Sequence, residues 1–258
     1  MEIRKLGQQE HQDSRRLYEE VFEEDSASFV DYYYTEKTRD NQIYVVEADG
    51  GIRSMLHLNP YRLYVNGSGK DVNYIVAVAT QKEYRKRGYM SVLLKTSLND
   101  MYQAGESFTF LMPASESIYA PFDFRTVYEQ NRRFYRSEDE EAADIAITDA
   151  KDEDCRELAG WANQRLAERY QVFAIRDEAY YQRLLREYKS DGGILKIYRK
   201  GGEIVDCRGY YPEENEEKLD ACLMNSQGMD HDSGFRWLPT AVADYRLTGK
   251  RESRNRAL

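Results

Sequence analysis

The sequence predicts a mixed α/β (α+β) protein with two successive domains, each a mixed sheet flanked by helices, the second degenerate and partial. Helical periodicity over residues 8–34 is followed by period-two alternation from residue 41 and by a strand–loop–helix unit at 72–104. A charged segment without large apolar side chains lies at 136–144, and a second helix–helix–strand–strand series begins after it. With 258 residues the chain is long enough for two modest cores.

The first domain is predicted to begin with two helices and a series of antiparallel strands. Apolar and aromatic residues recur at helical spacing over residues 8–24 and again over 29–34. From residue 41 the alternation is that of strands with one buried face. The expected strands are 43–48, 52–58 and 61–65, with Asp49-Gly50-Gly51 as a hairpin turn, Pro60 as a strand end and Asn66-Gly67 as the closing turn.

Residues 72–104 organise this domain because they combine a buried strand, a basic loop and a long helix. Residues 74–80 are a short apolar run rich in β-branched side chains, which predicts a buried strand. Another strand is expected at 108–112, reached through Gly105 as the helix C-cap. Between them, apolar residues have the spacing of an amphipathic helix at Met90, Leu93, Leu94, Leu98 and Met101.

The junction between strand and helix has the features of an anion site. A helix start presents unpaired N–H groups and a partial positive charge. Gly88 lets the backbone approach a ligand, and Arg85 and Arg87 supply donors suited to phosphate oxygens. We therefore expect a pyrophosphate here, the alternative being a solvated helix cap with surface arginines. The patterns G-x-G-x-x-G and G-x-x-x-x-G-K-[ST] do not occur, which argues against nicotinamide and nucleoside-triphosphate sites.

Arg85-x-x-Gly88-x-Met90 resembles the R/Q-x-x-G-x-G/A signature with which GNAT-superfamily N-acetyltransferases hold the pyrophosphate of coenzyme A. Met90 departs from that pattern, since it replaces the small last residue. The preceding Val78-Ala-Thr80 is similar to the strand whose backbone pairs with the pantetheine arm. The resemblance implies acetyl-CoA as acyl donor, bound by Val78, Thr80, Arg85, Lys86, Arg87, Gly88, Tyr89 and Met90.

Further motifs resemble the Eis-like (enhanced intracellular survival) branch of that superfamily. These are Asn59-Pro60-Tyr61, residues 72–76, the segments VAT and YRKRGYM, and residues 111–122, in that order. The similarity extends over roughly the first 220 residues. It implies tandem acetyltransferase (GNAT) folds, in a branch where a sterol-carrier-like domain normally follows. We expect that this chain stops too soon to contain that domain.

The resemblance also implies a catalytic acid, since Tyr119 lies where the family's S-x-x-Y segment carries a tyrosine that protonates the coenzyme thiolate. A phenol of ordinary pKa suits that role because the thiolate is comparably basic. The alternative is a tyrosine packed against its loop. The family's first two helices flank the acceptor pocket, so an acidic, aromatic mouth for an ammonium group is expected from Glu24, Asp25, Phe29 and Tyr33, with Glu116 as a further carboxylate. Alternatively these aromatics are core residues and the acids are solvated.

The second domain is predicted from a repeat of the helix–helix–strand–strand order. Helices are expected at 154–170 and 178–188, and strands at 194–198, 203–211 and 218–224. No R-x-x-G loop precedes a helix there, so we expect a degenerate acetyltransferase fold without a coenzyme site. The predicted division is residues 1–140, 141–225 and an irregular tail over 226–258.

Composition narrows the functional classes. The net charge of −9 disfavours nucleic-acid binding and favours a cationic amine as acceptor. Three cysteines without metal-ligand spacing and three histidines give no basis for a metal site. No apolar run approaches membrane-spanning length, and the first residues lack the apolar core of a signal peptide, so a cytoplasmic location without membrane contact is expected.

The expected activity is acetyl transfer from acetyl-CoA to a primary amine, such as an aminoglycoside, a polyamine or lysine, by direct attack in a ternary complex. Two alternatives stay open: a catalytically weak acetyl-CoA-binding module for regulation or assembly, and an anion-binding structural protein. The sequence leaves undetermined the acceptor, the general base, the state of any homo-oligomer, and whether the carboxylate of Leu258 reaches the site.

Overall fold

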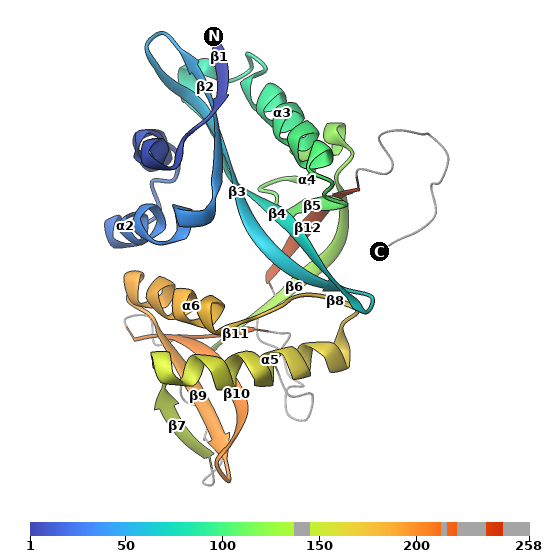
Figure 1. Ribbon diagram of the computed structural model, residues 1–258. Helices are drawn as coiled ribbons and strands as arrows, with labels where there is room; N and C mark the ends of the chain where they lie inside the picture. Colours follow the sequence, from blue (N-terminus) through green and yellow to red (C-terminus); the bar gives the residue numbers. More distant parts are fainter. Residues whose placement is uncertain (137–144, 213–215, 221–235, 245–258) are drawn as a thin grey trace. The chain divides into compact units, whose positions relative to one another are not determined.

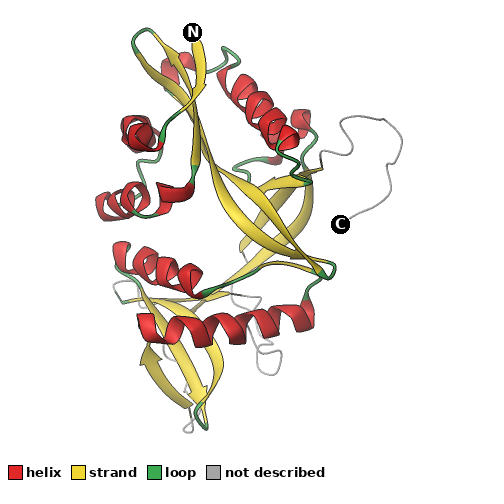
Figure 2. Ribbon diagram, viewed as in Figure 1, coloured by secondary structure: helices red, strands yellow, loops and turns green. Residues whose placement is uncertain are grey.

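The computed structural model describes residues 1–136, 145–212, 216–220 and 236–244 (Figure 1). The chain divides into two compact units. The first comprises residues 1–62, 70–129 and the described part of the segment that starts at Pro239, and the second comprises 63–69 and the described part of 130–238. Both units combine helices with strands (Figure 2), so the predicted mixed α/β class is confirmed.

The first unit is built on a mixed sheet with the strand order β1-β2-β3-β4-β5-β12. The β1–β2, β2–β3 and β5–β12 pairs are antiparallel, whereas β4 and β5 are parallel. The strand bounds are β1 Glu2–Lys5, β2 Gln42–Ala48, β3 Gly51–Val65, β4 Ser68–Thr80, β5 Phe108–Leu111 and β12 Arg236–Asp244.

Helices cover both faces of this sheet (Figure 1). The α3 face is filled by aliphatic residues such as Leu93 and Leu94, both fully buried, and the α1–α2 face by residues such as Leu17 and Val30. The helical bounds are η1 Gln8–Ser14, α1 Arg15–Val21, α2 Ala27–Thr35, η2 Lys37–Asp40, η3 Lys82–Tyr84, α3 Tyr89–Gln103, α4 Glu116–Tyr119 and η4 Ala120–Phe122.

The turns follow the sequence signals, but the strands are longer than expected. Asp49 and Gly50 have positive φ angles of 49° and 74°, as a two-residue hairpin turn requires. The expectation that Pro60 ends a strand is wrong, because β3 runs through it without a break. The register of β3 with β2 ends at Leu58, so Pro60 lies beyond that ladder, where a missing N–H is tolerated.

The second unit carries a sheet with the strand order β6-β11-β10-β9-β7, and the described pairs within it are antiparallel. Its core packs α5 and α6 side chains such as Leu158 and Tyr181 against strand residues such as Ile197. The bounds are β6 Arg125–Arg136, β7 Ile145–Asp149, η5 Asp152–Asp154, α5 Cys155–Arg169, β8 Val172–Ala174, α6 Glu178–Ser190, β9 Ile194–Lys200, β10 Glu203–Tyr211 and β11 Glu216–Asp220.

The predicted linker lies almost wholly outside the described residues, which resume at residue 145. The expectation of an irregular tail is wrong for Arg236–Asp244, which form β12 and pair with β5 from Ala241↔Leu111 to Asp244↔Phe108. The tail gave no periodic signal because a strand can be held by its partner's backbone rather than by its own pattern.

Candidate active site

The start of α3 is an uncapped helix N-terminus. Gly88, the N-cap residue, has φ 82° and ψ 4°, a left-handed conformation that glycine adopts without strain. The first backbone bond of the helix runs from the Val92 N–H to the Gly88 carbonyl, 3.0 Å. Within the described residues, neither a side chain nor a backbone carbonyl accepts from the amides of Tyr89, Met90 and Ser91. These three N–H groups are therefore available to an anion.

Basic side chains surround this helix start on the segment 81–88, which we name the coenzyme loop because the sequence predicts that it binds coenzyme A. Arg85, Lys86 and Arg87 are all exposed. The Nε of Arg85 donates to the Thr80 carbonyl at 3.2 Å, and the guanidinium of Arg87 lies 4.6 Å from the ring centroid of Tyr84. No acidic side chain of the described chain forms a salt bridge with either arginine, so both keep N–H donors for a ligand.

The end of strand β4 that leads into this loop is not paired with β5. The two strands pair only at Tyr74↔Phe110 and Ile75↔Leu111, although β4 continues to Thr80. Ala77 has a φ of 50°, which is uncommon for a non-glycine residue and interrupts the regular strand geometry. The last residues of β4 thus have a backbone edge that β5 does not pair, as needed for a pantetheine arm to add to the strand.

The predicted coenzyme residues of β4 and α3 are tied to one core. Val78, Tyr89 and Met90 are half-buried and pack against the cluster between the sheet and α3. The Oγ1 of Thr80 lies 2.7 Å from the Oγ of Ser54. Met90, the departure from the family's pattern, therefore directs its side chain into the core, while its amide stays at the helix start.

Tyr119 ends the short helix α4 and is 8% exposed. Its ring packs in the same cluster as Val78 and Met90 and lies 5.7 Å from the ring of Phe124, centroid to centroid. Burial, with a smaller contribution from Tyr74, raises the pKa of Tyr119 to about 12. Its hydroxyl has no hydrogen-bond partner in the part of the chain that the structure describes. The phenol therefore stays protonated at neutral pH, but it is a weaker acid than an ordinary tyrosine.

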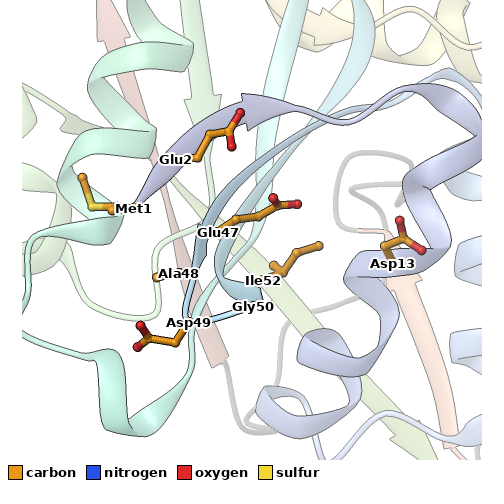
Figure 3. Close-up of a pocket in the computed structure, with 9 residues that line it drawn as sticks. Met1, Glu2, Asp13, Glu47, Ala48, Asp49, Gly50 and Ile52 are labelled. Atoms are coloured by element: carbon orange, nitrogen blue, oxygen red, sulfur yellow. The ribbon is translucent and has the colours of Figure 1, made fainter.

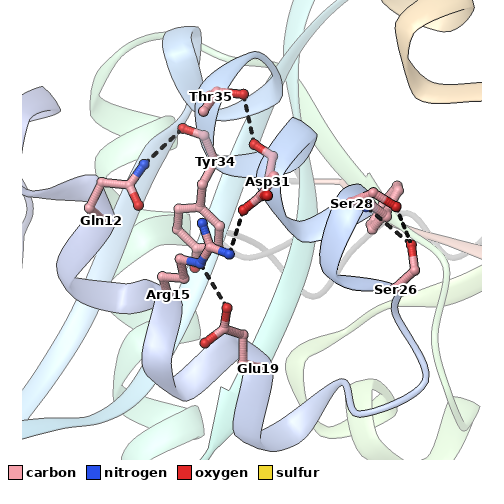
Figure 4. Close-up of polar contacts among 9 residues, drawn as sticks. Gln12, Arg15, Glu19, Ser26, Ser28, Asp31, Tyr34 and Thr35 are labelled. Atoms are coloured by element: carbon pink, nitrogen blue, oxygen red, sulfur yellow. Dashed lines mark hydrogen bonds and ion pairs between the residues drawn. The ribbon is translucent and has the colours of Figure 1, made fainter. Parts of the chain in front are cut away.

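The helices α1 and α2 are joined by polar contacts (Figure 4). The Arg15 guanidinium donates to Glu19 at 2.7 Å and to Asp31 at 2.6 Å, and the Ser26 side chain accepts from the Phe29 amide at 3.1 Å, capping α2. Ion pairs of this exposure are each worth less than ~1 kcal/mol, so their role is to fix the two helices together rather than to stabilise the fold strongly.

The residues predicted for an acceptor mouth have different environments. Glu24 is exposed, Asp25 and Phe29 are half-buried, and Tyr33 is buried. Asp25 accepts a hydrogen bond from the Tyr18 hydroxyl at 2.7 Å, and the Tyr33 hydroxyl lies 3.0 Å from Nδ1 of His57. Tyr33 thus presents no surface to a ligand, in line with the alternative that it is a core residue.

Glu116, the remaining carboxylate of the prediction, is exposed at the start of α4. It accepts a hydrogen bond from the Thr126 hydroxyl at 2.5 Å. Its place three residues before Tyr119 puts it on the same short helix as the predicted acid.

Sequence reasoning missed two groups near this site. Ala77 gives the bend in β4, and nothing in a run of small and β-branched residues indicates a positive φ. Arg53, on the β2–β3 hairpin, contacts the coenzyme loop through a hydrogen bond to Gln81, and it also donates to the Ala48 and Asp49 carbonyls of its own hairpin. A contact across 28 positions of the chain has no local signal.

An open depression of about 590 Å³ lies over β1 and the β2–β3 turn (Figure 3). Four of its lining residues are acidic: Glu2, Asp13, Glu47 and Asp49. It includes neither Gly88 nor Tyr119, and Glu47 is already paired with Arg4 at 2.8 Å. Among the described residues, no group of three or more His, Cys, Asp or Glu side chains is placed to hold a metal ion.

Residues 2–127 match the family described as acetyltransferase (GNAT) domain, and this part of the chain is therefore a GNAT acetyltransferase domain. No curated protein matches the sequence. No helix of the described residues is long and apolar enough to cross a membrane.

Solved structures extend the likeness of fold beyond that domain. A protein of unknown function from Enterococcus faecalis V583, a probable N-acyltransferase, is 17% identical, with a TM-score of 0.74 over 95% of this chain and 73% of that one. A GCN5-related N-acetyltransferase from Kribbella flavida is 12% identical, with a TM-score of 0.65 over 93% and 70%. Eis1 from Mycobacterium abscessus is 16% identical, with a TM-score of 0.59 over 83% and 54%. At these identities the likeness is one of fold.

Proposed function

We propose that this protein transfers an acetyl group from acetyl-CoA to a primary amine. The observation that carries the proposal is the uncapped start of α3 behind the left-handed Gly88, which the loop 81–88 connects to a strand end that β5 leaves unpaired. The free amides, with Arg85 and Arg87, suit a pyrophosphate, and the free strand edge suits a pantetheine arm. The GNAT domain of residues 2–127 supports this assignment.

The proposed reaction is direct attack in a ternary complex. The amine nitrogen forms a bond to the thioester carbonyl carbon, and backbone N–H groups near Val78 and Thr80 stabilise the negative charge on its oxygen. The carbon–sulfur bond breaks, the thiolate takes a proton from Tyr119, and the resulting tyrosinate regains a proton from solvent. Water or a carboxylate accepts the amine proton, with Glu24, Asp25 and Glu116 as candidates. No contact among these three favours one of them as the base.

The raised pKa of Tyr119 makes its hydroxyl a poor proton donor to the thiolate. A thiol has a pKa of ~8.5, so complete transfer from a phenol with a pKa near 12 is uphill by about three pKa units. Tyr119 then acts first as a hydrogen-bond donor to the departing sulfur, and proton transfer follows as bond breaking raises the basicity of that sulfur.

The same pKa supports the second candidate function, a coenzyme-binding module with weak catalysis that serves regulation or assembly. A poor acid slows thiolate departure but leaves coenzyme binding intact. Release of free thiol from acetyl-CoA in the presence of polyamines, aminoglycosides and lysine peptides distinguishes the two functions, because the module would bind the coenzyme and release none.

Coenzyme binding itself is tested by thermal unfolding with and without coenzyme A. A ligand at 100-fold over its dissociation constant adds ~2.7 kcal/mol to the free energy of unfolding. The wild-type protein should show this gain, whereas the Arg85→Ala/Arg87→Ala double variant should show much less. An unchanged transition in the wild type would contradict both functions and favour the anion-binding structural protein.

An Eis-like affiliation is supported by the ordered motifs and by the likeness of fold to Eis1. A degenerate acetyltransferase fold in residues 141–225 is supported by its helices packed on a sheet. A cytoplasmic role is supported by the odd count of three cysteines without metal-ligand spacing. The acidic charge favours a cationic acceptor over nucleic acid. A homo-oligomer is compatible with the family resemblance.

A further inference from the structure

Arg53 links the β2–β3 turn to the coenzyme loop through three hydrogen bonds. Its Nε donates to the Ala48 carbonyl at 2.9 Å, one terminal nitrogen donates to the Asp49 carbonyl at 2.9 Å, and the other donates to the side-chain oxygen of Gln81 at 2.9 Å. The first two acceptors belong to the hairpin turn and the third opens the coenzyme loop. A guanidinium with its fixed fork of donors suits such a set of separated acceptors.

The backbone reinforces this link. The Gln81 N–H donates to the Arg53 carbonyl at 2.9 Å, so Arg53 holds Gln81 through both its main chain and its side chain. The neighbouring Ser54 donates its hydroxyl to the Ala79 carbonyl at 2.8 Å. Consecutive residues of β3 thus hold the last residues of β4, the segment proposed to bind the thioester.

Tyr84 forms a second connection between the same elements. Its hydroxyl donates to the Asp49 carboxylate at 2.7 Å, and the guanidinium groups of Arg53 and Arg87 lie 4.9 Å and 4.6 Å from its ring centroid. Cations at this distance from an aromatic ring are attracted to it. The position of Arg87, a proposed pyrophosphate ligand, therefore depends on a ring that the hairpin and Arg53 hold in place.

We propose that Arg53 is a positioning residue for the coenzyme loop, acting through Gln81 and Tyr84. The inference rests on the proposed function, because it takes residues 81–88 as the binding loop for coenzyme A. Arg53 donates to three protein acceptors, whereas Arg85 and Arg87 retain donors for phosphate. Arg53 contributes to affinity by holding the loop in its binding conformation before coenzyme A binds. Without Arg53, part of the binding free energy would be spent on ordering the loop.

Isothermal titration with coenzyme A tests this role in the full chain. The variants are Arg53→Ala, Arg53→Lys and, as a matched control on the same strand, Arg62→Ala, whose side chain is 63% exposed in a single 3.3 Å ion pair with Asp71. Both Arg53 variants should raise the dissociation constant about tenfold, and the control should leave it unchanged within about twofold. Arg53→Lys keeps the positive charge but loses the fixed arrangement of guanidinium donors, so it distinguishes positioning from electrostatic attraction.

If Arg53 only stabilised the fold, its replacement would lower the melting temperature without changing the binding of coenzyme A. In thermal unfolding the coenzyme-induced shift should shrink in Arg53→Lys, and its KM for acetyl-CoA should rise while kcat stays within about twofold. If Arg53→Ala does not fold, Tyr84→Phe, which removes only the bond to Asp49, should raise the dissociation constant in the same direction.

Two results would overturn the inference while the proposed function stands. One is wild-type affinity in Arg53→Lys together with weak binding in Arg53→Ala, which would show an effect of charge alone. The other is wild-type affinity in both variants with only a lower melting temperature. A wild-type protein that does not bind coenzyme A would instead overturn the proposed function.

Discussion

The burial of Tyr119 has two effects that oppose each other in the proposed catalysis. Its burial next to Phe124 keeps water away from the sulfur it is proposed to face, but the same burial raises its pKa to about 12. The group therefore holds its proton across the physiological range. Its acidity, rather than its protonation state, sets what it contributes to the rate.

Replacing Tyr119 with Phe should lower kcat by about 10²-fold, the lower end of the range for acid catalysis, with little change in the KM for acetyl-CoA. The ring and its packing are retained, and only the hydroxyl is lost. Since the pKa of Tyr119 lies near 12, the wild-type rate should show no decline assignable to this group below about pH 10. The measurement is a pH–rate profile of both proteins, and an unchanged kcat in the variant would exclude Tyr119 as the acid.

His57 is fully buried and contributes a pH dependence of stability rather than of activity. Its Nδ1 faces the Tyr33 hydroxyl at 3.0 Å, its Nε2 is buried without a partner among the described residues, and burial lowers its pKa to about 3. In the unfolded chain the pKa is ~6.5, so between these values only the unfolded state takes up the proton. The free energy of unfolding should therefore fall as the pH falls through this window.

From pH 8 to pH 5 the expected loss from His57 is ~2 kcal/mol. In His57→Gln, which keeps a hydrogen-bonding group beside Tyr33, the free energy of unfolding should depend less on pH over this interval. Urea unfolding at several pH values gives both curves. Parallel curves for the two proteins would mean that His57 titrates normally in the fold.

At the level of elements, the start of α3 depends on the left-handed conformation of Gly88. Gly88→Ala should lower the free energy of unfolding by ~1 kcal/mol, because an L-residue is strained at φ 82°, although a Cβ there would meet no atom within 4 Å. The control is Gly160→Ala inside α5, where a Cβ also meets nothing within 4 Å and φ is not positive. That variant should instead gain ~0.5–1 kcal/mol. Opposite signs in urea unfolding support the prediction, and equal signs contradict it.

The elements that the sequence predicts well are those with local signals. The helix at 89–103, the Asp49-Gly50 turn and the helices of the second unit follow from periodicity and from glycine or asparagine at fixed positions. The sequence does not predict β1, β6, β7, β8 and β12, since these strands are held by partners distant in sequence, as in the pairing of Glu2 with Glu47. The exact strand registers and the bend at Ala77 likewise have no local signal in the sequence.

The candidate site divides in the same way. The residues of the coenzyme loop are predictable because a strand, a basic glycine loop and a helix are contiguous. The burial of Tyr33 and the role of Arg53 are not, because both depend on which strands become neighbours. From the sequence alone, Tyr33 on its helix is equally compatible with a core position and with a ligand contact. The packing of His57 against its ring decides for the core position.

For the whole molecule, the coenzyme site is proposed to lie within the first unit alone. Hydrogen exchange with coenzyme A should therefore show slower exchange for amides in residues 76–92 and unchanged exchange in α5 and α6, residues 155–169 and 178–190. The measurement compares peptides of the free and the coenzyme-saturated protein. Protection of equal size in both units would contradict a site confined to the first.

The β2–β3 turn has a consequence for inhibition. The same Ala48 and Asp49 whose carbonyls hold Arg53 also line the acidic depression beside β1. A cationic compound seated there would touch the anchor of the coenzyme loop without occupying the place of the coenzyme. Such a compound would raise the KM for acetyl-CoA and leave kcat nearly unchanged, so saturating acetyl-CoA would relieve its effect although the two ligands bind at separate places.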